Sequence, residues 1–168
     1  CDGLGTMWVC NPEKLISYPS KSLTDGAMDS TKTGRFYGEP HGQYISTLKA
    51  VGTRHGMDFS LPWKELPVEA KRLALEGSGE EVYDITWHFK RKERTGEHHF
   101  TGRGIGLLAL IRDEYKRKHA DHRGEEMKSV MKEIECPTCH GNRLTEKALA
   151  YRLNGCSITM LAKLPVNQ

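Results

Sequence analysis

The sequence predicts an α+β fold in which a small antiparallel hairpin packs with several helices. One segment alternates apolar and polar residues as a half-buried strand does, and four others repeat apolar residues at helical spacing. Short cysteine–glycine motifs also lie near both ends of the chain, at Cys1 and at Cys139. The hairpin and its helices are therefore expected to form a segment inserted between two halves of one small motif.

The clearest strand is VYDITWHFK, residues 82–90. Its apolar positions occur at every second residue, which buries one face of a strand and leaves the other in water; they are Tyr83, Ile85, Trp87 and Phe89. RKERTGE reads as a turn, and HHFTG, residues 98–102, reads as the returning strand. His98 and His99 then point to opposite faces and cannot bind one metal ion together.

Two helices are expected before the hairpin. The first covers residues 43–55, where Tyr44, Leu48 and Val51 recur at helical spacing before a glycine at position 56. The second begins at Pro67 and ends at Gly77. Residues 6–28 read as a loop with one or two short strands, and residues 34–42 as turn-rich.

Two more helices are expected after the hairpin. The first places Leu107, Leu108, Ile111 and Tyr115 on one face, and the second, residues 124–135, does the same with Met127, Val130, Met131 and Ile134. Beyond Cys139 we expect a helical turn capped by Thr145, a hairpin turn at Asn154-Gly155, and a last helical turn near Thr159.

The stretch CPTCHGNR, residues 136–143, has the spacing of half a zinc site. The chain begins with CDGLG, which repeats the cysteine-x-glycine pattern of Cys139 and Gly141. A second Cys-x-x-Cys would need a cysteine three positions before Cys1, so we interpret the chain as a piece trimmed inside a zinc knuckle. Its zinc ligands are then Cys1, Cys136 and Cys139, and three thiolates should hold zinc weakly or not at all.

Alternatives to zinc binding are less favoured for these cysteines. A thioredoxin-like redox pair at Cys136 and Cys139 lacks the expected βαβ context, and Cys10 and Cys156 are interpreted as plain buried thiols. An odd count of five cysteines without a secretory signal favours a reducing compartment. No apolar run approaches the ~20 residues that would cross a membrane.

Charge is concentrated between His88 and Arg123. This segment holds ten Lys or Arg and five Asp or Glu, a balance of +5 in a chain whose net charge is +3. Such a basic segment indicates a polyanion partner, although an ordinary solvated surface is about as good an interpretation. No phosphate-binding loop of the Walker type and no catalytic triad is present, so we expect no catalytic residue and no enzyme activity in this chain.

Several motifs resemble the UvrA family, the A subunit of the bacterial nucleotide excision repair nuclease and an ABC-type ATPase. They are CDGLG, SLTDGA, PWKEL, GSGEE, IGLL and CPTCHGNRLTEKALAYRLNGCSI, in the family's order along nearly the whole chain. The resemblance implies an insertion domain at residues 30–135. It also implies flanks at residues 1–29 and 136–168 that belong to the zinc module of the signature domain.

The resemblance implies double-stranded DNA as the partner and a cytoplasmic protein. A homodimeric parent would bind ATP and the excision nuclease B subunit through regions outside this chain. Candidate DNA-binding residues are Lys90, Arg91, Lys92, Arg94, Arg103, Lys116, Arg117, Lys118 and Arg123. Asp113 and Glu114 stand where typical members carry two arginines, which removes one expected DNA contact.

Two rival hypotheses remain from the sequence. The domain could be a protein-interaction or regulatory module of a diverged, antibiotic-resistance type of UvrA-like protein, with only incidental DNA contact. A chaperone-type zinc knuckle would also use Cys-x-x-Cys-x-Gly repeats, but in four complete copies close together.

Overall fold

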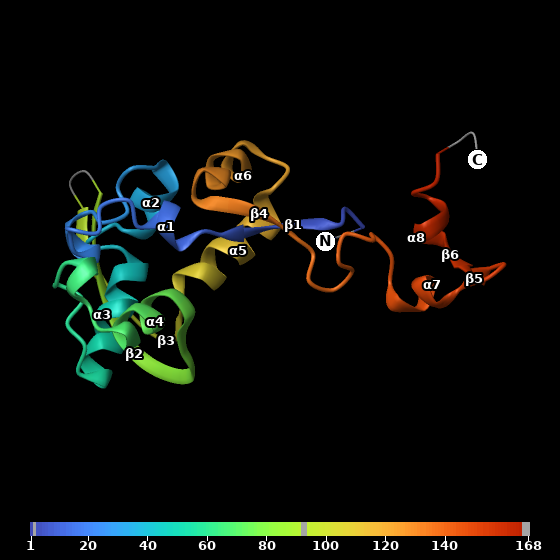
Figure 1. Cartoon of the computed structure of the whole chain (residues 1–168). Coiled ribbons are helices and arrows are strands. Elements are labelled where there is room, and N and C mark those ends of the chain that lie inside the picture. The colour runs from blue at the N-terminus through green and yellow to red at the C-terminus, as the bar shows by residue number, and fades with distance from the viewer. Residues whose placement is uncertain (2, 92–93, 166–168) are drawn as a thin grey trace. The chain divides into compact units, whose positions relative to one another are not determined.

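The computed structural model describes residues 1, 3–91 and 94–165, and for residues 90, 91 and 94 it describes the backbone alone (Figure 1). The chain divides into two compact units. The larger is Val9–Lys132, and the smaller combines Cys1–Trp8 with Glu133–Gln168. Residues 9–29, which we expected in the N-terminal flank, fall within the larger unit.

The larger unit is an α+β fold built around one long hairpin, as the sequence predicts (Figure 1). Its elements are α1 (Pro12–Leu15), η1 (Leu23–Asp25), α2 (Lys32–Tyr37), α3 (Gln43–His55), η2 (Trp63–Glu65), α4 (Val68–Glu76), β2 (Gly77–Arg91), β3 (Arg94–Ile105), α5 (Leu107–Lys118), α6 (His122–Met127) and η3 (Lys128–Val130). The predicted helices at 43–55 and after Pro67 are confirmed as α3 and α4.

Strands β2 and β3 pair antiparallel with Ile85 opposite Phe100 and Trp87 opposite His98. The predicted alternation is confirmed, and its buried face packs against α3. Burial decreases along β2 toward the end of the hairpin: Tyr83 and Ile85 are buried, whereas Trp87 and Phe89 are half-buried. The end of the hairpin therefore carries an aromatic face that the core only partly covers.

The core lies between this hairpin and the helices. In α5, Leu107 and Ile111 are buried as expected, while Leu108 and Tyr115 are half-buried. Helix α5 packs between α4 and α6. The largest fully buried side chains are Tyr37, Leu15, Leu23, Met28, Ile45, Ile85, Leu107, Ile111, Met127, Met131, Val51 and Val130.

The turn expected at residues 91–97 is shorter, because β2 reaches Arg91 and β3 begins at Arg94, and the loop expected at residues 6–28 also contains α1. Two further predictions of local structure were wrong. The expected helix at 124–135 continues only through α6 and η3, and its last third is strand β4 (Met131–Glu135), which pairs with β1 (Thr6–Cys10). Pairing with a strand more than a hundred residues away outweighs the local helical spacing.

The second error concerns residues 34–42, whose first part is helical as α2. Helix α2 can form there because Gly34 lies against the backbone carbonyl of Met28. A Cβ at position 34 would come within 1.8 Å of that oxygen.

The described part of the smaller unit contains the outer ends of β1 and β4 and four short elements: α7 (Glu146–Ala150), β5 (Arg152–Leu153), β6 (Cys156–Ser157) and α8 (Ile158–Leu161). The Thr145 hydroxyl accepts from the Ala148 N–H and caps α7, as predicted. Asn154 and Gly155 take φ values of 48° and 80°, the left-handed pair that a two-residue hairpin turn requires. Within the described residues, no helix is long and apolar enough to cross a membrane.

Candidate nucleic-acid interface and cysteine cluster

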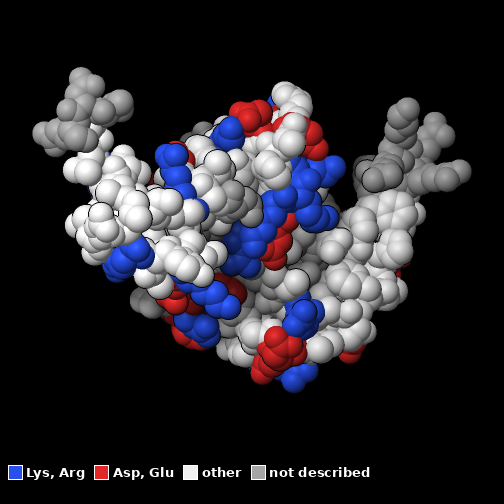
Figure 2. Space-filling model, turned by 90° about the vertical axis from the view of Figure 1, so that its right-hand side faces the viewer, with Lys and Arg blue, Asp and Glu red and all other residues white. Residues whose placement is uncertain are grey.

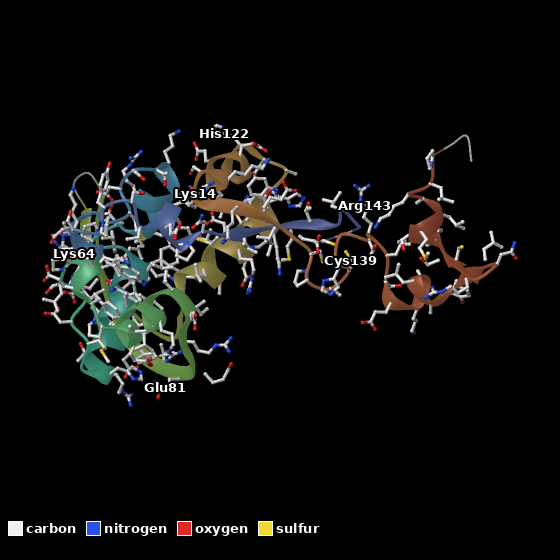
Figure 3. All side chains as sticks on the ribbon, viewed as in Figure 1. Lys14, Lys64, Glu81, His122, Cys139 and Arg143 are labelled. Atoms are coloured by element: carbon white, nitrogen blue, oxygen red, sulfur yellow. The ribbon has the colours of Figure 1, made fainter. Side chains whose placement is uncertain are left out.

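The smaller unit brings together the three cysteines that the sequence predicts as zinc ligands. The sulfur atoms of Cys1, Cys136 and Cys139 all lie within 4.8 Å of one another, and the Cys1 and Cys139 sulfurs are 3.6 Å apart (Cys139 is labelled in Figure 3). The Cys136 N–H donates to the Gly5 carbonyl over 2.9 Å. This hydrogen bond joins the two chain segments that carry the cluster.

The local backbone explains why these thiols suit a metal. Gly3 and Gly141 take φ values of 81° and 73°, so the glycine after each cysteine turns the chain as expected. Hydrogen bonds from the backbone N–H groups of Cys139 and then Thr138 lower the pKa of Cys136 to about 7. A thiol with a lowered pKa is more readily deprotonated, and the thiolate is the form that binds zinc.

The two remaining cysteines differ from each other. Cys10 is buried, which confirms the prediction of a buried thiol, and this burial raises its pKa to about 12. Cys156 is half-buried in β6, so the prediction of a plain buried thiol was wrong at this position.

The exposed cations of the larger unit include the last turn of α5. Lys116, Arg117 and Lys118 are all exposed there. Lys118 lies 3.5 Å from Asp121, and the Arg117 Nε donates to the backbone carbonyl of Asp113. Arg103, on β3, is half exposed and forms an ion pair with Glu80 over 2.7 Å.

Arg123 lies in a different environment from the other predicted contacts. Its guanidinium lies 3.1 Å from Glu114 and stacks over the Phe36 ring at 4.6 Å, and only 23% of the side chain is exposed. The Tyr37 hydroxyl donates to the same Glu114 carboxylate. Burial alone would raise the pKa of Glu114, but the hydrogen bonds from Arg123 and Tyr37 outweigh it and hold that pKa below its usual range.

Four predicted contacts, Lys90, Arg91, Lys92 and Arg94, are close together in the sequence. Lys92 is outside the described residues, and the backbones of Lys90, Arg91 and Arg94 occupy the paired ends of β2 and β3. Arg91 stands opposite Arg94 in the register, so cationic residues occur on both strands at this end. On the face drawn in Figure 2, basic and acidic side chains are interspersed.

The hairpin places its histidines as predicted, on opposite faces. His99 lies on the polar face, where its Nδ1 is 2.8 Å from the Thr86 hydroxyl. His98 lies on the aromatic face, where its ring stacks on Trp87 with centroids 5.7 Å apart and planes 12° from parallel. His122 on α6 lies 3.3 Å from Glu126, and His119 before it lies 3.0 Å from the Lys116 carbonyl.

Sequence reasoning missed a cleft beside this aromatic face. It has a volume of about 450 Å³ and is lined by Trp87, Phe89, His98, His88, Glu39, His41 and Gly42. The alternation in β2 predicts the aromatic side, but the other wall comes from the turn between α2 and α3. No local pattern in the sequence connects residues 39–42 with residues 87–98.

Comparison with known proteins decides the family. The family model described as the UvrA DNA-binding domain matches residues 11–132, nearly the same span as the larger unit. The chain belongs to the UvrA family. The resemblance seen in the sequence motifs is therefore confirmed, and so is the expectation of a DNA-binding domain.

The relatives named UvrABC system protein A match this UvrA chain along most or all of its length. The protein of Neisseria meningitidis is 27% identical over 169 residues, covering 100% of this chain and 17% of the relative. That of Mycobacterium bovis is 28% identical over 157 residues, covering 92% and 15%. The chain thus spans about one-sixth of the length of the curated relatives it matches.

A solved structure supports the fold of this UvrA chain. The crystal structure of UvrA2 from Deinococcus radiodurans superposes with a TM-score of 0.64 at 19% identity. The match covers 96% of this chain and 20% of the solved one. At this identity the likeness concerns the fold, which agrees with the α+β prediction.

Proposed function

We propose that the chain is the DNA-binding insertion domain of an excision-repair ATPase subunit and helps to hold duplex DNA during damage recognition. The observation that carries the proposal is the match of residues 11–132 to the UvrA DNA-binding domain. The basic segment between His88 and Arg123 supplies the positive charge that phosphate contacts require.

The proposed contacts fall into two groups. The hairpin end supplies Lys90, Arg91, Lys92 and Arg94, and the last turn of α5 supplies Lys116, Arg117 and Lys118. The α5 residues are exposed, and the backbones of Lys90, Arg91 and Arg94 lie at the ends of β2 and β3, so phosphate contacts there need not disturb the core. Such contacts carry little sequence information, which suits a protein that surveys all DNA.

Arg123 and Arg103 are the weaker candidates of the proposed set. Arg123 serves the interior, where it offsets the Glu114 carboxylate, and moving it to a phosphate would leave that half-buried charge unpaired. Arg103 would first have to leave Glu80, an exposed pair that costs little to break. We therefore rank both below the hairpin end and α5.

Three further properties of the full-length protein belong to the proposal. Residues 30–135 are the insertion domain, and the flanks at 1–29 and 136–168 belong to its base. Cys1, Cys136 and Cys139, which lie close enough to share an ion, are zinc ligands in the full-length protein. ATP hydrolysis, dimerisation and transfer of DNA to the B subunit are carried by other parts of the protein.

The test is duplex binding by the chain across a range of salt concentrations, measured by fluorescence anisotropy. Replacing the hairpin-end residues Lys90, Arg91, Lys92 and Arg94 by alanine should weaken binding. It should also flatten the plot of log K against log salt by about 0.9 for each lost phosphate contact. The far-UV circular dichroism should stay unchanged because these residues follow the buried part of the hairpin.

A charge-matched control separates a specific site from general attraction. Lys21, Lys49 and Lys64 are exposed, Lys71 is half-buried, and all four lie outside the hairpin and α5, so replacing them by alanine removes the same formal charge. This control variant should bind duplex nearly as tightly as the parent chain. Equal loss in both variants, or none in the hairpin variant, would contradict the proposed site and favour a protein-interaction role for the hairpin.

A further inference from the structure

We propose that the aromatic cleft beside the hairpin end takes an unstacked nucleobase, so that the domain prefers DNA with locally unpaired bases. The inference rests on the proposed function, because it assigns a substrate class to the same DNA-binding surface. It goes beyond phosphate contacts, which cannot distinguish a paired from an unpaired strand.

The cleft has the chemistry of a base-stacking platform. Trp87, Phe89 and His98 present three rings to it, with the Phe89 centroid 5.9 Å from Trp87 and 6.2 Å from His98. Trp87 and Phe89 are half-buried and His98 is exposed, so ring surface remains open to a ligand. Aromatic side chains of this kind bind bases through their π-faces, whatever the base.

The rings are held in place rather than free to collapse on one another. Phe89 lies across Gly96 of the opposite strand, where an added Cβ would come within 2.6 Å of its ring. The Trp87 ring is fixed by its stack on His98, its direct partner in the register. A preformed aromatic surface costs less ordering when a ligand binds.

The opposite wall supplies hydrogen-bonding groups that a base edge can use. Glu39 can accept from the exocyclic amino group of adenine, cytosine or guanine, and His41 can donate or accept. A carboxylate in the cleft would repel a phosphate, which argues against a site for the DNA backbone there. A volume of about 450 Å³ falls within the ~300–1,000 Å³ typical of small-molecule sites.

The position of the cleft connects base and backbone. Phe89 is followed directly in β2 by Lys90 and Arg91, about 3–7 Å further along the strand. A strand whose phosphates lie on the hairpin end can therefore place a neighbouring base in the cleft. A paired base keeps its faces inside the helical stack, so only an unstacked base can enter.

The experiment compares two labelled duplexes that differ only in a short unpaired bulge, bound by the parent chain at one salt concentration. We expect the parent chain to bind the bulged duplex at least about fivefold more tightly, the lower end of what one stacked base contributes. Trp87→Ala should abolish this preference while leaving affinity for paired duplex unchanged. Trp87→Phe should retain most of it because a ring remains.

Phe100→Ala is the matched control, because Phe100 belongs to the same hairpin and lies over Gly102, outside the cleft. It should keep the preference for the bulge. If Trp87→Ala loses its far-UV circular dichroism, His98→Ala decides instead, since His98 is exposed and its removal leaves the core intact. His98→Ala should reduce the preference.

Tryptophan fluorescence gives a second readout. With Trp8→Phe and Trp63→Phe, Trp87 is the remaining tryptophan of three, and stacking of a base on it should quench its emission more with bulged than with paired DNA. Equal affinity of the parent chain for both duplexes, or a preference that survives Trp87→Ala, overturns the inference while duplex binding stands. Absence of binding to either duplex overturns the proposed function itself.

Discussion

The two units of this chain are stabilised by different means. The larger unit buries more than a dozen apolar side chains among the hairpin and its helices. In the described part of the smaller unit, the buried residues are Gly5, Cys136, Cys139 and Ser157. Several of its large apolar side chains are exposed instead, namely Leu4, Tyr151, Leu153, Ile158, Met160 and Leu164.

This difference teaches where each unit is vulnerable. Burial of apolar surface is the main force behind a folded domain, so the larger unit should be sensitive to changes in its core. The smaller unit depends on local turns, helix caps and the cysteine cluster, so it should respond to backbone strain and to metal. Changes that damage one unit should leave the other largely unaffected.

The largest effect is expected from Ile111→Ala, at a fully buried position of α5. Loss of a buried isoleucine side chain should lower the free energy of unfolding of the larger unit by about 2–5 kcal/mol, which urea denaturation measures. Ile158→Ala is the control in the smaller unit, where the side chain is 53% exposed, and it should change stability by less than about 0.5 kcal/mol. An equal loss of stability in both variants would contradict the proposed difference between the two units.

A smaller loss is expected from Glu114→Gln, which removes the nearer of the two carboxylates beside Arg123 and leaves Glu126 at 3.9 Å. The cost should be about 2 kcal/mol at neutral pH, as for other hydrogen bonds to charged groups. Because the pKa of Glu114 is lowered in the folded state, its contribution is present above its ordinary value and is lost on acidification. The difference between parent and variant should therefore shrink below pH ~4.

Asp113→Asn is the control for this variant on the same helix. Asp113 forms an exposed ion pair with Arg112, which should contribute less than about 1 kcal/mol. If Asp113→Asn lowers stability as much as Glu114→Gln does, the half-buried contact between Glu114 and Arg123 contributes no more than an exposed ion pair.

Next in size is the response of the smaller unit to loss of one cysteine. Cys136→Ala removes one of three clustered thiols and should weaken zinc binding by at least about tenfold, measured by competition with a chromophoric chelator. Cys156→Ala should leave zinc affinity unchanged because this thiol lies outside the cluster. Tight zinc binding that survives Cys136→Ala would mean that other ligands hold the ion.

The smallest loss of stability is expected from two matched glycine-to-alanine substitutions, one in each unit. Gly155 and Gly56 both take positive φ, 80° and 66°, and a Cβ at either position meets nothing within 4 Å. Alanine should therefore cost about 1 kcal/mol of backbone strain at each. In Gly56→Ala this cost should lower the stability of the larger unit, whereas in Gly155→Ala hydrogen exchange should rise only around residues 152–157.

The sequence predicts the elements that depend on interactions between residues close together in the chain. The strand at 82–90, the helix ending before Gly56 and the turn at Asn154-Gly155 follow from periodicity and from glycine, and all three are present. The cysteine cluster was also predictable, since the spacing of Cys136 and Cys139 and the matching motif at Cys1 are visible in the sequence.

What could not be predicted depends on distant contacts. Met131 and Ile134 fit a helical face as well as a strand, and only the pairing of β4 with β1 decides between them. The inward role of Arg123 depends on Glu114 and Phe36, which lie on two other helices. The cleft likewise needs a wall from residues 39–42, far from Trp87 in the chain.

The pairing of β1 with β4 has a consequence for how such a domain can be moved between proteins. The chain enters the larger unit at Val9 and leaves it at Lys132, and next to these points the Asn11 N–H donates to the Val130 carbonyl over 2.9 Å. Since entry and exit are adjacent, residues 9–132 can replace a short loop of a host without stretching it. One genetic insertion or deletion can therefore add or remove the whole unit.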